Sequence, residues 1–148
     1  MITKFENEYS FLSNFYPSPI TYQGITFPTV EHFFQAMKTL NPAEFIEIKD
    51  ASTPGKAKRL GRKVTLRPDW ENVKVSIMKV ALHLKFDNME LREKLLATGD
   101  EYLVEGNTWH DNFWGSCECE QCGNHGQNML GQLLMEVRKE IEEDVWMD

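Results

Sequence analysis

The chain has 148 residues, with 16 basic and 23 acidic side chains and a formal net charge of −7 at pH 7. A chain of this length can bury roughly two-thirds of its unfolded surface, so we expect one domain over residues 1–148. The acidic charge disfavours a general duplex-DNA binder, which needs many phosphate contacts. The sequence has no apolar run of membrane-spanning length and no signal-peptide pattern at its start, so we expect a cytoplasmic protein.

Most of the chain is predicted to be helical. Residues 3–27 are rich in aromatic and turn-forming residues, which indicates short strands and loops with a turn at residues 22–25. A capping residue precedes each of four later segments: Thr29, Asn41, Thr53 and Asn88. Apolar periodicity and capping predict helices over residues 30–40, 42–49, 54–61, 69–86, 88–99 and 130–141. A short strand at 102–105 and a long irregular stretch at 106–127 complete a mainly helical α+β domain with short N-terminal strands.

The first predicted helix has two different faces. Its apolar stripe consists of Val30, Phe33, Phe34, Met37 and Leu40, which we expect to face a core. A neighbouring stripe carries Glu31, Gln35 and Lys38, four and three residues apart. Spacing alone leaves two interpretations equally open for this stripe, a solvated helix edge or a functional site. His32 lies roughly opposite, and we expect it to make structural hydrogen bonds.

A basic segment follows this helix. Between residues 51 and 68 there is no acidic residue, and there are six basic ones: Lys56, Lys58, Arg59, Arg62, Lys63 and Arg67. A local basic patch on an acidic protein fits a small phosphorylated ligand better than a long nucleic acid. Taken alone, however, the pattern is more typical of a solvated helix face.

The irregular stretch at 106–127 is unusually long for a compact domain, which makes it the first place to look for function. In it, Asp111 stands three residues before Trp114, and Gly115 follows. An indole can stack on a planar base or a sugar while a carboxylate handles protons or positive charge. Glycosidic cleavage generally uses two carboxylates around an oxocarbenium-like transition state, and Glu31 is available as the second. A structural role of the aromatic residues in the core is the alternative.

Five segments together resemble the NADAR, or YbiA-like, family, in the family's order. They are Phe11–Pro17, Thr29–Lys38, Ala57–Arg62, Asp111–Gly115 and Asn128–Met135. The resemblance extends from about Phe5 to Arg138. It implies a mainly helical α+β fold of the YbiA-like type and N-glycosidase activity. Members of the family resemble hydrolases of ribosylamino-pyrimidine phosphates from riboflavin synthesis, or enzymes that reverse ADP-ribosylation by removing ADP-ribose from guanine in nucleic acid.

The resemblance also implies which residues form the site. Glu31 and Asp111 match the catalytic carboxylates, and Trp114 matches the stacking residue. Lys38 is a rival catalytic group, because an amine near C1 of the sugar could form a Schiff base with the opened ring. The remaining matched positions are expected to bind substrate: Asn14, Lys58, Arg62, Gly115 and Asn128. No redox cofactor or catalytic metal is expected.

A cysteine loop departs from the shorter linker of the simplest family members. Cys117, Cys119, Cys122 and His125 fall within nine residues, and a tetrahedral zinc ion could use them as ligands. Their spacing is tighter than the usual paired-ligand patterns. We therefore expect reduced free thiols in this loop, with a structural zinc site as the alternative; a disulfide is the least favoured outcome.

The preferred hypothesis is therefore a hydrolase of the N-glycosidic bond in a phosphorylated ribosyl compound, either a free metabolite or ADP-ribosylated nucleic acid. The alternative is a non-catalytic module that binds NAD or ADP-ribose with the same basic patch and Trp114. Glu31 and Asp111 favour the enzyme, because two carboxylates would repel a phosphorylated ligand unless they meet a cationic centre. A zinc-knuckle nucleic-acid binder rests on the cysteine loop alone.

Overall fold

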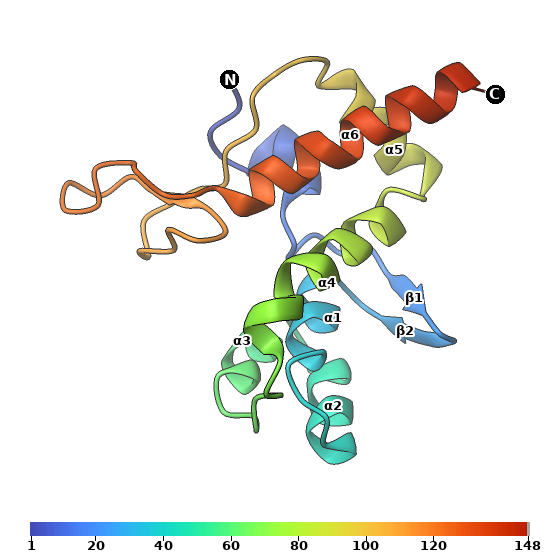
Figure 1. Cartoon of the computed structure of the whole chain (residues 1–148), viewed down its shortest axis with the longest axis vertical. Coiled ribbons are helices and arrows are strands. Elements are labelled where there is room, and N and C mark those ends of the chain that lie inside the picture. The colour runs from blue at the N-terminus through green and yellow to red at the C-terminus, as the bar shows by residue number, and fades with distance from the viewer. Residues whose placement is uncertain (148) are drawn as a thin grey trace. The chain divides into compact units, whose positions relative to one another are not determined.

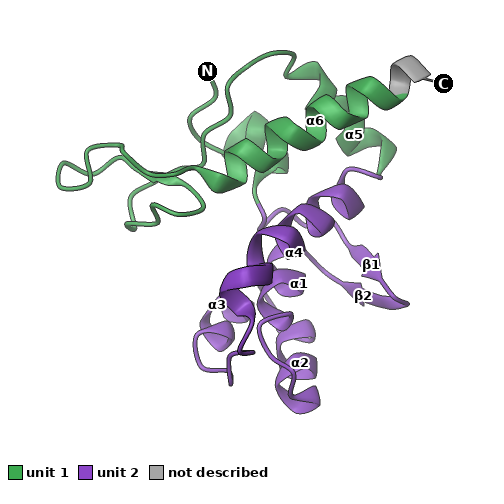
Figure 2. Cartoon of the chain, viewed as in Figure 1, with its two compact units in different colours: residues 1–13, 88–148 green, residues 14–87 purple. Residues whose placement is uncertain are grey.

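The structure is a computed structural model that describes residues 1–147, with side chains to residue 144. The chain forms two compact units, coloured separately in Figure 2. Unit 1 combines residues 1–13 with the chain from residue 88 onward, and unit 2 comprises residues 14–87. None of the helices in the described part is long and apolar enough to cross a membrane.

Unit 2 begins with a two-stranded antiparallel hairpin. Strand β1 (Ile20–Tyr22) pairs with β2 (Ile25–Phe27), and Tyr22 lies opposite Ile25. The two turn residues, Gln23 and Gly24, both have positive φ, as the tight hairpin turns that match strand twist require. The turn predicted at residues 22–25 is therefore confirmed.

Helix α1 (Val30–Ala36) lies at the centre of unit 2, as Figure 1 shows. It contacts α2 (Pro42–Lys49), α3 (Pro54–Gly61) and α4 (Trp70–Lys85). Because three helices cover it, all seven of its residues are buried, including Glu31 and Gln35. The solvated-edge interpretation of these two residues is therefore wrong.

Two predictions for the ends and faces of helices in unit 2 are also wrong. Leu40 is 69% exposed, because α1 ends at Ala36 and the chain has left the helical path. In α4, the helical period predicts a core-facing stripe of Trp70, Val73, Ile77, Val80, Ala81 and Leu84. Val80 is instead 40% exposed, whereas Lys85, just outside that stripe, is 1% exposed. The helix has apolar side chains on more than one face, and the face that includes Met78 and Leu82 is the one that packs inward.

The predicted helix starts are confirmed by their hydrogen bonds. The side chains of Thr29, Asn41 and Thr53 accept from backbone N–H groups in the first turns of α1, α2 and α3. Asn88 does the same for α5 (Met89–Ala97) in unit 1. Each side chain satisfies a backbone donor that has no partner inside its helix.

Unit 1 contains a 3-10 helix, η1 (Asn7–Leu12), and the helices α5 and α6 (Met129–Met147), which contact each other. The helical period of five apolar residues predicts the inward face of α6, and all five are buried: Leu130, Leu133, Leu134, Val137 and Ile141. The strand predicted at 102–105 is wrong, because only Leu103 makes an isolated bridge there, to Ile2. Regular pairing occurs instead between the short parallel strands β3 (Gly106–Asn107) and β4 (Ser116–Cys117).

Candidate functional site

In unit 2, Glu31 is a carboxylate held inside the protein. Glu31 is 7% exposed, and its Oε1 accepts a hydrogen bond of 2.8 Å from Nε2 of Gln35. Its backbone N–H donates to the carbonyl of Asn14 at 3.1 Å, which joins the Asn14 segment to the start of α1. Hydrogen bonds therefore hold both the side chain and the backbone of Glu31.

Two buried acceptors accompany Glu31. Oδ1 of Asn14 and Oε1 of Gln35 are buried and have no hydrogen-bond partner among the described residues. The amide nitrogen of Asn14 donates to Sδ of Met78 at 3.6 Å, which leaves the carbonyl end for another donor. Buried polar atoms without a partner are rare in proteins. Each of these two acceptors therefore lacks a donor that the described residues could have supplied.

Lys38 follows the same helix and has an unusual electrostatic environment. Burial lowers the pKa of its ammonium group; Glu31 opposes this effect, and the nearby charges of Arg62, Lys58 and Lys74 add to the lowering. Its Nζ also lies 5.9 Å from the ring centroids of both Phe34 and Trp70. A lowered pKa makes a lysine a better nucleophile at neutral pH.

The structure thus places Lys58 of α3 and Arg62, the residue that caps the end of α3, within electrostatic range of Lys38. Lys74 of α4 also acts on the charge of Lys38, and it was not among the predicted binding residues. The helical spacing of Trp70 and Lys74, four residues apart on one helix face, is the signal that could have found it. Unit 2 therefore combines one buried carboxylate with several cations, an arrangement suited to an anionic ligand with one cationic centre.

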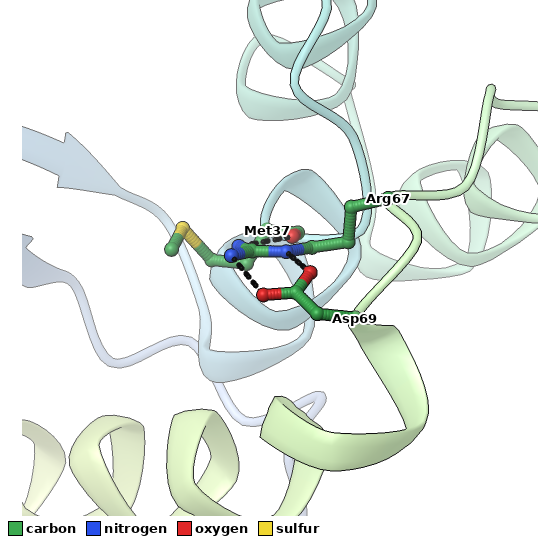
Figure 3. A network of polar contacts seen from close by, with 3 residues as sticks. All are labelled: Met37, Arg67 and Asp69. Carbon is green, nitrogen blue, oxygen red and sulfur yellow. Dashed lines mark hydrogen bonds and ion pairs between the residues drawn. The ribbon is translucent and has the colours of Figure 1, made fainter.

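A salt bridge holds the chain that follows Lys38. Figure 3 shows Arg67 between the carboxylate of Asp69 and the carbonyl of Met37. Nε and Nη2 of Arg67 donate to the two oxygens of Asp69 at 2.6 and 3.1 Å, and Nη1 donates to Met37 at 3.4 Å. The backbone N–H of Arg67 also donates to the carbonyl of Lys38 at 2.8 Å. Arg67 of the basic segment is therefore a structural clamp.

A hollow of about 300 Å³ lies elsewhere in unit 2, between the hairpin and the start of α2. Its lining is mostly apolar and includes none of the predicted site residues. His32 has the structural role that we expected: Nδ1 lies 2.8 Å from Oγ1 of Thr29, and Nε2 lies 2.9 Å from the carbonyl of Ala51.

In unit 1, Asp111 organises the loop that carries Trp114. Its Oδ1 accepts from the backbone N–H groups of Phe113 at 3.1 Å and Trp114 at 3.0 Å. The side chain of Asn107 holds the Asp111 backbone through both its N–H and its carbonyl. Oδ1 of Asp111 therefore closes the turn from Asp111 to Trp114. Trp114 is half-buried and packs edge-to-face on Phe113, with ring centroids 4.8 Å apart.

This loop is fastened to the start of α6. The backbone N–H groups of residues 128, 129 and 130 donate to the carbonyls of Gly115, Phe113 and Trp114, respectively. These are among the donors that a helix start leaves without partners. The two sequence segments 111–115 and 128–135 are therefore parts of one structural feature.

Gly115 and Asn128 have clear structural roles. A Cβ at Gly115 would overlap Oε2 and the backbone carbonyl of Glu105. The Asn128 amide accepts from the N–H of Glu105 at 2.9 Å and donates to the carbonyl of Leu103 at 2.8 Å. Because both ends of this buried side chain already have backbone partners, the predicted role of Asn128 in substrate binding has no support in its contacts.

The three cysteines gather around a histidine, but not the one that we expected. Cys117, Cys119 and Cys122 have their Sγ atoms within 4.8 Å of one another and of a ring nitrogen of His110, a group that could hold a metal ion. His125 is outside this group, and its ring lies beside Gly123. The chain folds back between β3 and β4, which brings residue 110 to the cysteines, so proximity in sequence selected the wrong histidine.

The predicted residues are thus divided between the units: Asn14, Glu31, Lys38, Lys58 and Arg62 in unit 2, and Asp111, Trp114, Gly115 and Asn128 in unit 1. The structure brings the first set together around Glu31 and the second around the start of α6. That Glu31 and Asp111 serve one site stays a prediction.

Comparisons with known proteins place these motifs in a family. The N-glycosidase YbiA of Escherichia coli is 44% identical over 140 residues, which cover 91% of this chain and 83% of that protein. A riboflavin biosynthesis protein of Vibrio vulnificus is 37% identical; the match covers 93% of this chain and 37% of that protein. The NMR structure of E. coli YbiA superposes with a TM-score of 0.86 at 39% identity, covering 100% of this chain and 89% of that one.

These relatives confirm the predicted fold, and their names agree with the predicted activity, hydrolysis of N-glycosyl bonds. The NADAR domain model matches residues 2–142, a range that includes all five of the motifs identified in the sequence. The chain belongs to the NADAR domain family.

Proposed function

We propose that the chain hydrolyses the N-glycosidic bond of a phosphorylated ribosyl compound at a site built around Glu31. The observation that carries this proposal is the environment of Glu31 in unit 2. A buried carboxylate lies among the charges of Lys38, Lys58 and Arg62, beside two buried acceptors without partners. Cations suit the phosphate, acceptors suit the ribose hydroxyls, and a carboxylate suits the cationic sugar of the transition state.

The proposed chemistry needs two carboxylates with different tasks. One of Glu31 and Asp111 stabilises the oxocarbenium-like sugar and accepts a proton from the attacking water. The other assists departure of the base as the bond between C1 and nitrogen breaks. Hydrolysis involves no net oxidation or reduction, so the reaction requires no redox cofactor. The family match runs through both units, which supports a single functional domain containing both carboxylates.

Lys38 offers a second route through the same site. The lowered pKa of Lys38 raises the share of its neutral amine, which can attack C1 and displace the base as the base nitrogen takes up a proton. Opening of the sugar ring then gives a Schiff base between C1 and Nζ, and water hydrolyses it to release the sugar and restore the amine. Borohydride added during turnover would reduce that Schiff base to a stable adduct on the peptide containing Lys38. If no adduct forms and Lys38→Arg remains active, direct attack by water is the mechanism.

Two substrate classes fit the proposal. The riboflavin biosynthesis name of a relative supports a ribosylamino-pyrimidine phosphate, a free metabolite. The family resemblance supports ADP-ribosylated guanine in nucleic acid, with Trp114 as a platform for the base or the adenine ring. The acidic charge of the chain, −7, favours the free metabolite, because a nucleic-acid acceptor is repelled outside the local basic patch.

The test is product release measured by mass spectrometry. Wild type, Glu31→Gln and Asp111→Asn are incubated separately with ribosylamino-pyrimidine phosphate and with DNA carrying ADP-ribosylated guanine. Glu31→Gln keeps an oxygen that can accept from Gln35, so it removes the charge while retaining the packing. Glu47→Gln, an exposed carboxylate on α2, is the control.

We expect wild type and Glu47→Gln to release ribose phosphate or ADP-ribose, and each site variant to lose about 10²–10⁴-fold in kcat. The substrate that wild type cleaves identifies the acceptor class. If wild type cleaves neither compound but all four proteins bind ADP-ribose equally tightly, the chain is a non-catalytic NAD or ADP-ribose-binding module, and the proposed function is wrong.

A further inference from the structure

The cluster of His110, Cys117, Cys119 and Cys122 has the geometry of a metal site. Nδ1 of His110 lies 3.3 Å from Sγ of Cys122, 3.5 Å from Sγ of Cys119 and 3.7 Å from Sγ of Cys117. All four potential ligand atoms lie within 4.8 Å of one another. One nitrogen and three sulfurs therefore surround a common point.

Hydrogen bonding does not explain this arrangement. Nδ1 of an imidazole carries at most one hydrogen, so it can donate to only one of the three sulfurs. A central ion does explain it. With a Zn–S distance of about 2.3 Å and a Zn–N distance of about 2.0–2.1 Å, tetrahedral geometry places nitrogen and sulfur ligands about 3.5 Å apart. The three observed distances fall around that value.

The backbone is folded in a way that presents the sulfurs inward. The N–H of Cys122 donates to Sγ of Cys119 at 3.3 Å, and the N–H of Gly123 donates to the carbonyl of Cys119 at 2.9 Å. Gly123 has a φ of 64°, the left-handed conformation that glycine adopts without strain. This turn brings two cysteines three residues apart to one point, and an N–H directed at sulfur stabilises a thiolate.

The rest of the loop fixes the other two ligands. Cys117 is fully buried in β4, and its backbone N–H donates to Oδ1 of Asn112 at 2.9 Å. His110 has a φ of 68°, which turns the chain toward the cysteines. The backbone of Cys117 is thus held by a hydrogen bond within the loop, and Asn107 holds the backbone of Asp111, the residue that follows His110.

We propose that His110, Cys117, Cys119 and Cys122 bind one structural zinc ion. Three thiolates and one imidazole form a closed tetrahedral donor set, which Zn²⁺ favours and which leaves no open position for catalysis. The ion closes the loop between β3 and β4. It would also restrain Asp111, which follows His110 directly, although binding of the metal does not depend on the proposed function.

The test is the zinc content of the purified full chain, measured by elemental mass spectrometry after zinc reconstitution under reducing conditions. The site variants are Cys119→Ser and His110→Asn; asparagine tolerates the positive φ of residue 110 and lacks the imidazole. His125→Asn is the matched control, because His125 lies in the same loop but outside the cluster. Cobalt(II) titration adds a second measurement, since thiolate ligands give a characteristic charge-transfer absorption.

We expect one zinc ion per chain in wild type and His125→Asn, and a loss of at least about tenfold in zinc affinity in both site variants. Chelation should lower the melting temperature of wild type and His125→Asn. Circular dichroism of the variants separates loss of zinc from loss of the fold. The proposal is overturned if folded wild type takes up no zinc, if His125→Asn loses the metal while His110→Asn keeps it, or if the mass of reconstituted wild type shows a disulfide.

Discussion

Gly61→Ala should damage unit 2 through the hydrogen bond that positions Glu31. Gly61 ends α3 against α1, and a Cβ at this position would overlap Oε1 of Gln35 and lie 2.8 Å from its Cδ. It would also lie 3.2 Å from Cβ of Gln35, an atom that cannot move without moving α1. Gln35 must therefore rotate away and give up its bond to Glu31, or the two helices must separate.

The expected loss of stability combines three contributions. Losing a buried hydrogen bond to a carboxylate costs about 1.5–3 kcal/mol, and overpacking costs about 1–3 kcal/mol. Replacing glycine by alanine in a helix returns up to about 1 kcal/mol. We therefore expect the free energy of unfolding to fall by about 2–5 kcal/mol. The same shift of Gln35 misplaces Glu31, for which we expect a loss of kcat of about 10²-fold.

Urea unfolding and steady-state hydrolysis measure the two effects. Gly55→Ala is the matched control in the same helix, because its nearest atoms would be 3.9 Å and 4.0 Å away, at ordinary contact distance. The double variant Gly61→Ala/Gln35→Ala should be about as stable as Gln35→Ala alone, since removing the Gln35 side chain makes room for the new Cβ. If Gly61→Ala matches Gly55→Ala in both stability and kcat, this account of Gln35 is refuted.

Three other expected outcomes follow from single residues. Burial lowers the pKa of Lys85 from 10.5 to about 7, so above pH 7 the unfolded chain binds more protons and wild type gains stability as pH rises. Relative to Lys85→Met, urea unfolding should show wild type gaining on the order of 3 kcal/mol between about pH 6.5 and about pH 9.5; a constant difference would contradict this. Asn128→Ala should lower the free energy of unfolding by about 2–4 kcal/mol, with Asn128→Gly less affected because residue 128 has a φ of 53°; equal losses would show that the hydrogen bonds alone matter. Zinc chelation should reduce the kcat of wild type but not of a folded His110→Asn variant; equal sensitivity would show that the chelator acts elsewhere.

The helix starts could be predicted from sequence because their cause is local. Thr29, Asn41, Thr53 and Asn88 each supply a side-chain oxygen to backbone donors two or three residues away, and no distant residue is needed. The faces of the helices depend instead on what packs against them. The burial of Lys85 in α4, 1% exposed, could not be predicted, because charged residues are almost always assigned to a solvent face.

Glu31 and His110 show why the chemistry of the site is harder to predict than its residue types. The stripe containing Glu31 was ambiguous because a buried carboxylate and a solvated one have the same helical spacing; only the three helices around α1 decide between them. The resemblance to the NADAR family matched Glu31 to a catalytic carboxylate, a role that stays a prediction, and it implied nothing about the burial or the contacts of Glu31. For the metal cluster, the motif contained the three cysteines, but the fourth ligand comes from a residue seven positions before Cys117. A ligand separated from the motif by a chain reversal can be found only once the two strands of the loop are seen together.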